Sequence, residues 1–124
     1  MLTFHASVHG SDDEGAGPLS TTFDSALAAL ECLPRLFIEP DGSFVWTSIT
    51  VDGQAWQVDG NLIDRGDCLA YAELKGSCPE ERFDMLLSAL GWPEARLVFQ
   101  LPQRGVLLDE TAFRRLAATE LGAI

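Results

Sequence analysis

The sequence predicts one α+β domain, with a mainly antiparallel sheet of five to six strands packed by three helices, in the order β-α-β-β-β-β-α-β-α. Apolar residues alternate in several segments and recur with helical spacing in three others. The central strands are joined by short turns rich in Asp and Gly, too short for the crossovers that parallel strands require. A length of 124 residues suits a single domain over 1–124.

The amino-terminal segment is predicted to be a strand, followed by a loop and a helix. Apolar residues alternate with polar ones in this strand, at Leu2, Phe4, Ala6 and Val8. Residues 11–20 contain three acidic residues, two Gly and one Pro, and this composition indicates an acidic, flexible loop. The helix has its apolar stripe at Phe23, Ala26, Leu27 and Leu30. Thr21 with Asp24 resembles a capping box, and Pro34 ends the helix.

The middle of the chain is predicted to be an antiparallel meander. Asp52-Gly53 is a strong signal for a two-residue hairpin turn, which would place Ile49 opposite Trp56. Asp59-Gly60 lies inside a strand, and we favour a β-bulge there because glycine within a strand often marks one. The predicted strands cover 35–39, 43–51, 54–64 and 68–75.

The last third of the chain is predicted to form a helix, a strand and a second helix. Pro79 is suited to the first turn of a helix, whose stripe ends at Leu90 before Gly91. A strand follows over 95–101, and Asp109 is expected to cap the final helix. Arg114-Arg115 is expected to lie on the solvated edge of that helix. The helical stripes are Phe83, Leu86, Leu87 and Leu90, then Phe113, Leu116, Ala117 and Leu121.

The charge balance argues against two classes of partner. The formal net charge is −11, so a nucleic-acid backbone or an anionic membrane surface would be repelled. No stretch of about 20 apolar residues could span a membrane. The amino terminus lacks the basic and apolar regions of a secretory signal, and three cysteines without a C-x-x-C motif suggest reduced thiols. We therefore expect a soluble protein of the cytoplasm.

Metal, cofactor and catalytic motifs are not recognised in the sequence. His5 and His9 would stand about 13 Å apart in a strand, too far to share one ion. The oxygen-bearing residues between 59 and 67 lack the order of a calcium loop, and turn chemistry explains them equally well. We expect no cofactor, no metal site and no preassembled catalytic centre.

A recognition surface is the alternative to a reactive centre. With the two-residue turn, Phe44, Trp46, Gln57 and Asp59 would share one face of the central hairpin, and aromatic side chains beside polar groups suit partner binding. Helices could instead cover that face, which would make Trp46 part of the core.

We therefore expect a non-enzymatic interaction module that binds a protein partner or itself as a homodimer. The alternative is a small pocket enzyme or ligand binder. Its reactive groups would be brought together by the fold, namely His5, Asp64, Asp67 and Cys78. Cys78 is the more reactive cysteine in this alternative, because it is predicted to lie exposed at a helix start.

Overall fold

The computed structural model describes residues 1–13, 15–66 and 68–119. Within these ranges the chain forms eight strands and three helices. The strands are β1 Leu2–Asp12, β2 Gly15–Gly17, β3 Leu36–Ile38, β4 Ser43–Ile49, β5 Ala55–Arg65, β6 Cys68–Cys78, β7 Leu97–Leu101 and β8 Val106–Asp109. The helices are α1 Phe23–Glu31, α2 Glu80–Ala89 and α3 Glu110–Ala118.

The strands form one antiparallel sheet, so the predicted α+β class is confirmed. The strand order is β3-β4-β5-β6-β1-β7-β8, and β2 pairs with the far end of β1. The sheet has more strands than predicted, because β2 and β8 contain only three and four residues. Segments this short have no recognisable alternation of their own, and pairing with a longer neighbour stabilises them.

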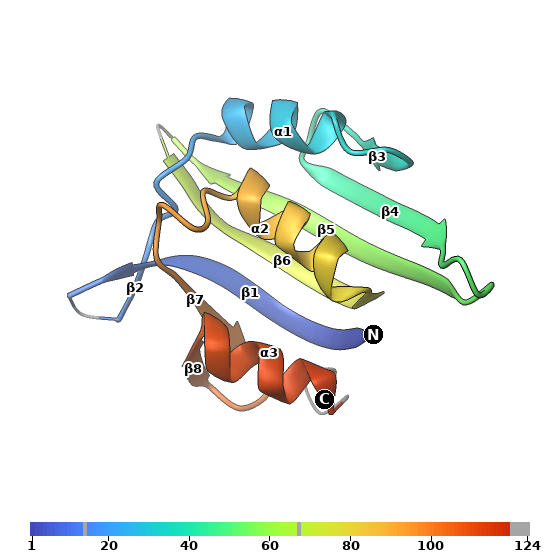
Figure 1. Ribbon diagram of the computed structural model, residues 1–124. Coiled ribbons are helices and arrows are strands. Elements are labelled where there is room, and N and C mark those ends of the chain that lie inside the picture. Colours follow the sequence, from blue (N-terminus) through green and yellow to red (C-terminus); the bar gives the residue numbers. More distant parts are fainter. Residues whose placement is uncertain (14, 67, 120–124) are drawn as a thin grey trace.

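The three helices cover one side of the sheet (Figure 1). Each presents an apolar stripe to the alternate residues of the strands beneath, as the spacing of its apolar residues predicts. The Phe4 ring of β1 lies 5.0 Å from Phe83 of α2 and 6.4 Å from Phe113 of α3, measured between ring centroids. One core therefore lies between the helices and the sheet.

The β4–β5 turn corrects the predicted hairpin. Thr50 N donates to Gln54 O at 2.9 Å, which leaves a three-residue loop that ends at Gly53 with φ of 91°. Trp46 consequently pairs with Val58, and Ser48 pairs with Trp56. A shift of one residue turns every side chain to the other face of the strand.

The shift moves Phe44 and Trp46 into the core, which confirms the alternative in which helices cover their face. The Trp46 indole Nε1 donates to Pro34 O at 2.8 Å, so its polar group is satisfied although the side chain is fully buried. Trp46 and Trp56 meet edge to face with centroids 5.1 Å apart. Phe44 and Trp46 therefore do not share a face with Gln57 and Asp59.

The bulge predicted at Asp59-Gly60 is also wrong. Gly60 pairs regularly with Phe44 and Leu74, and the register shifts instead between Ile63 and Asp64. Glycine is needed at position 60 for a different reason: a Cβ atom there would lie 2.0 Å from the Phe44 ring. The absent side chain makes room for an aromatic ring.

The loop predicted over 11–20 is in part a hairpin. β1 continues to Asp12, and β2 pairs with it so that Gly10 lies opposite Gly17. A Cβ atom on Gly10 would lie 2.2 Å from Pro18 O, so the chain returns close to its own backbone. The composition indicated a loop over all ten residues and concealed this short pair of strands.

The predicted start of α3 is confirmed, and the predicted starts of α1 and α2 each differ by one residue. Asp109 caps α3 by accepting from Ala112 N at 2.8 Å, as expected. Thr22, not Thr21, caps α1 by accepting from Ser25 N at 3.1 Å. Pro79 is the N-cap of α2, and Gly91 follows the helix with φ of 107°.

Arg114 corrects the prediction that both arginines of α3 are solvated. Its side chain is only 12% exposed and joins α3 to α2. Its guanidinium contacts three carboxylates and lies over two aromatic rings, each at 5.2 Å from the centroid. The carboxylates are those of Glu80 at 3.5 Å, Asp84 at 2.7 Å and Glu110 at 2.6 Å, and the rings are those of Phe83 and Trp92.

Candidate functional site

The described helices leave the second side of the sheet uncovered, and we call this surface the open face. It carries the side chains that alternate with the buried core residues, and these are half-buried or exposed. On the four central strands they are Thr3, His5, Ser7 and His9 of β1, Tyr71, Glu73, Lys75 and Ser77 of β6, Gln57, Asp59 and Asn61 of β5, and Val45 and Thr47 of β4.

The strand register arranges these side chains in rows across the sheet. Asp59 lies opposite Lys75, and Lys75 lies opposite His5. In the next row on this face, Asn61 lies opposite Glu73, and Glu73 lies opposite Ser7. Two acidic groups and one lysine give these rows a formal charge of −1 with neutral His5, against −11 for the whole chain. One lysine therefore lies beside two acidic groups at the centre of the open face.

Apolar groups lie at both margins of the open face. Phe37 of β3 is 73% exposed and pairs with Val45, which continues the row that contains Asp59. At the other margin the exposed Leu107 of β8 pairs with Gln100, which itself pairs with Ser7. Polar side chains bordered by exposed apolar ones are typical of protein interfaces.

A shallow hollow of about 340 Å³ lies on the open face over β1, β6 and β7. The His9 ring stacks on Tyr71 with centroids 5.0 Å apart, and His9 Nε2 forms a hydrogen bond with Ser7 Oγ at 3.0 Å. The residues that line this hollow are His5, Ala6, Ser7, His9, Tyr71, Glu73, Gln100 and Pro102.

A serine hydroxyl that is hydrogen-bonded to an imidazole resembles the nucleophile and general base of a catalytic site. Such a site also needs a group that orients the imidazole through its second nitrogen, and donors that stabilise an oxyanion. In the part of the chain that the structure describes, the contacts of His9 are Ser7 and the Tyr71 ring, and no carboxylate bonds to the imidazole. The hollow thus presents the hydrogen-bonding groups of Ser7 and His9 beside the Tyr71 ring.

Partial burial lowers the pKa of His9 below its ordinary value. The unfolded chain therefore takes up a proton at a higher pH than the folded chain does. Stability is expected to fall as the pH decreases through the usual histidine range, and the variant His9→Gln should lose this part of the pH dependence. Urea unfolding between pH 8 and 5 measures the unfolding free energy of both proteins. If this free energy depends on pH in the same way in the variant, His9 is not the source of the pH dependence.

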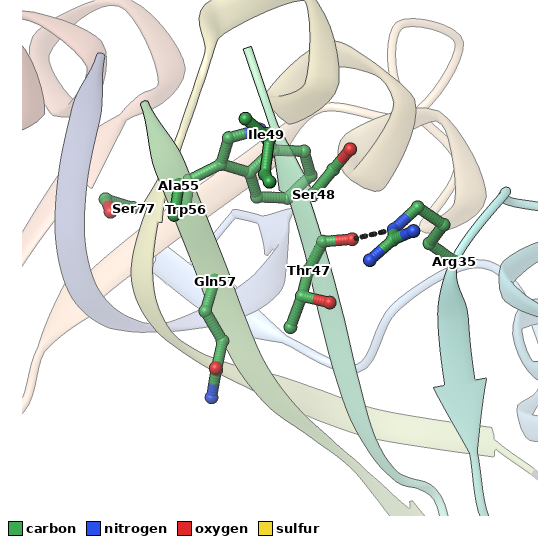
Figure 2. Close-up of a pocket in the computed structure, with 8 residues that line it drawn as sticks. All are labelled: Arg35, Thr47, Ser48, Ile49, Ala55, Trp56, Gln57 and Ser77. Atoms are coloured by element: carbon green, nitrogen blue, oxygen red, sulfur yellow. Dashed lines mark hydrogen bonds between the residues drawn. The ribbon is translucent and has the colours of Figure 1, made fainter. Parts of the chain in front are cut away.

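A second hollow of about 450 Å³ lies where β4 continues past the end of β3. Figure 2 shows Arg35 alongside β4, where its Nε donates to Thr47 O at 3.1 Å. Arg35 has φ of 67°, which directs the chain into β3. The guanidinium thus occupies a backbone acceptor that the short strand β3 leaves unpaired. The other lining residues are Ser48, Ile49, Ala55, Trp56, Gln57 and Ser77.

The fold divides the residues predicted for partner binding. Gln57 and Asp59 lie exposed on the open face, where the Gln57 amide donates to Asp59 Oδ1 at 2.9 Å. Phe44 and Trp46 lie on the opposite side, in the core. No motif in the sequence marks Ser7, Tyr71, Glu73 or Lys75. Alternation with Ala72 and Leu74 marks the last three as one face of a strand, but their position beside β1 follows only from the sheet order.

The three described groups of the alternative pocket do not come together. His5 lies on the open face, Cys78 is buried on the helix side opposite Leu2, and Asp64 is exposed near the end of β5. Asp67 lies outside the described residues. Cys78 is the last residue of β6, not the exposed helix start that was predicted, because Pro79 caps α2 one residue later.

Burial raises the pKa of the Cys78 thiol to about 12. This cysteine should therefore resist maleimide at neutral pH in the native protein, since the thiolate is the reactive form. Cys32, exposed at the end of α1, should react first. Mass spectrometry of peptides labelled before and after unfolding measures this order, and early labelling of Cys78 would contradict its burial.

Across the described ranges, no group of three His, Cys, Asp or Glu side chains could hold a metal ion. None of the described helices is long and apolar enough to cross a membrane. No family model matches the chain, and no match was found among curated proteins or solved structures.

Proposed function

We propose that this protein is a non-enzymatic interaction module of the cytoplasm that binds a protein partner through the open face. The observation that carries the proposal is the one-sided cover of the sheet, with all three described helices on one face. Antiparallel sheets tolerate one solvated face, but this face also has exposed apolar groups at both margins.

The chemistry of the open face supports a protein partner. Its centre holds amide, hydroxyl, imidazole and phenol groups, and the nearest exposed apolar residues include Phe37 and Leu107. Such a mixture of polar and apolar groups is typical of interfaces between proteins. The chain's charge of −11 disfavours polyanionic partners, because their affinity depends on Lys and Arg.

The test compares two Ser→Arg variants on opposite sides of the molecule. The variant Ser7→Arg places a bulky cation in the middle of the open face, and the variant Ser88→Arg places the same group on the exposed surface of α2. The full chain and both variants are attached to a support through Cys32, which lies at the end of α1. A cell lysate is passed over each support, and the retained proteins are identified by mass spectrometry.

We expect the full chain and Ser88→Arg to retain the same protein, and Ser7→Arg to lose it. Equal unfolding midpoints of the two variants would show that the loss does not come from misfolding. Equal retention by both variants would contradict the proposal, and so would an unmodified chain that binds neither another protein nor a second copy of itself.

A further inference from the structure

We infer that the open face binds a second copy of this chain, so that the open faces of the two copies pack against each other. The two-fold axis lies between the two sheets and runs across the strands over Leu74. This inference rests on the proposed function, because it names the partner of the same surface. The middle of the open face lies on β6, the fourth of seven strands along the sheet order. Leu74 lies between Glu73 and Lys75, the two charged residues that β6 presents on the open face.

A two-fold axis at this position brings opposite charges together. It keeps each strand over its equivalent and reverses its direction, so Lys75 faces Glu73 of the second copy and Glu73 faces Lys75 of the second copy. Stacked sheets lie about 10 Å apart, a distance that extended Lys and Glu side chains span together. One surface thus supplies both members of two equivalent ion pairs.

The neighbouring strands fit the same operation. Asp59 shares the row of Lys75, and Asn61 shares the row of Glu73, so the axis brings Asp59 to Asn61 of the second copy. On β1 it brings His5 to Ser7 of the second copy. No like charges meet at the centre. Stacked sheets cross at about 30°, which displaces groups near the axis least.

The charges at the centre of the open face nearly cancel, which suits contact between two acidic chains. Two copies of a chain with charge −11 repel each other, so association needs a contact where the acidic residues are few. The central rows of the open face have a net charge of −1, from Asp59, Glu73 and Lys75. Lys75 is the only lysine in the chain, and it lies at the middle of this face.

The test exchanges charges across the proposed axis in the full chain. The variants are Lys75→Glu, Glu73→Lys and the double variant with both substitutions. Both side chains are exposed, so folding should be preserved, and circular dichroism checks it. Sedimentation equilibrium measures association at several protein concentrations.

We expect the unmodified chain to dimerise and each single variant to associate at least about tenfold more weakly, because like charges then face each other twice. The double variant restores two opposite pairs and should dimerise again. A mixture of the two single variants should form a heterodimer, since one then presents two acidic groups to two basic groups.

Three results would overturn the inference: an unmodified chain that is monomeric at every concentration, single variants that dimerise like the unmodified chain, or single variants that do not associate on mixing. A monomeric chain whose Ser7→Arg variant still loses a retained protein would overturn the dimer and leave the proposed function intact. A monomeric chain that retains no protein would contradict both.

Discussion

The variant Gly76→Ala is expected to lose about 4 kcal/mol of unfolding free energy, the sum of a strained backbone and a steric clash. Gly76 has φ of 142° in the middle of the sheet, a conformation that residues with side chains rarely adopt. A Cβ atom there would lie 2.1 Å from Gln57 O of the neighbouring strand. The strained φ angle and the clash with Gln57 O both involve backbone atoms, so a change of side-chain rotamer relieves neither.

The matched control is Gly53→Ala. Gly53 also has a positive φ, of 91°, but a Cβ atom there would have no neighbour within 4 Å. We expect it to lose only the strain, about 1–2 kcal/mol. Urea unfolding measures the loss of unfolding free energy in both variants, provided that the dependence of this free energy on urea concentration is unchanged. Equal losses would show that contact between β5 and β6 is not what requires glycine at position 76.

The variant Arg114→Ala is expected to lose about 2–3 kcal/mol of unfolding free energy. The substitution removes a cation from between two aromatic rings and leaves three carboxylates close together without a counter-charge. Asp84 and Glu80 are about half exposed or more, so solvent screens them and limits the loss.

The adjacent variant Arg115→Ala provides the control on the same helix. Arg115 is exposed, and its removal should change stability by less than about 0.5 kcal/mol. Thermal unfolding of both variants at one pH measures the difference. A loss in Arg114→Ala no greater than in Arg115→Ala would show that the contacts between α2 and α3 contribute little.

The periodic segments made the fold class predictable. The alternation of Leu2, Phe4, Ala6 and Val8 and the helical spacing around Phe83 and Phe113 fix which side of each element is buried. These patterns gave three helices and an antiparallel sheet correctly. They depend only on residues a few positions apart, which is why they are readable without tertiary information.

The register of the central hairpin was not predictable in the same way. Asp52-Gly53 suits a two-residue turn, yet the chain forms a three-residue loop, because this loop buries Trp46, Trp56 and Val58 together. Tertiary burial thus outweighs local turn preference. The candidate site could not be predicted for a similar reason. His5 and Ser7 lie beside Lys75 and Glu73 only because β1 pairs with β6, and these two strands are far apart in the sequence.

The most direct test of the dimer through the open face uses the single lysine of the chain. A mixture of ¹⁴N- and ¹⁵N-labelled protein is treated with a carbodiimide, which joins amines to carboxylates in contact, and isotope-mixed peptides identify links between copies. The dimer predicts a link from Lys75 of one copy to Glu73 of the other. Links between copies that join only the terminal amine, or that join Lys75 to carboxylates of the helix side such as Glu31 or Glu94, would contradict it.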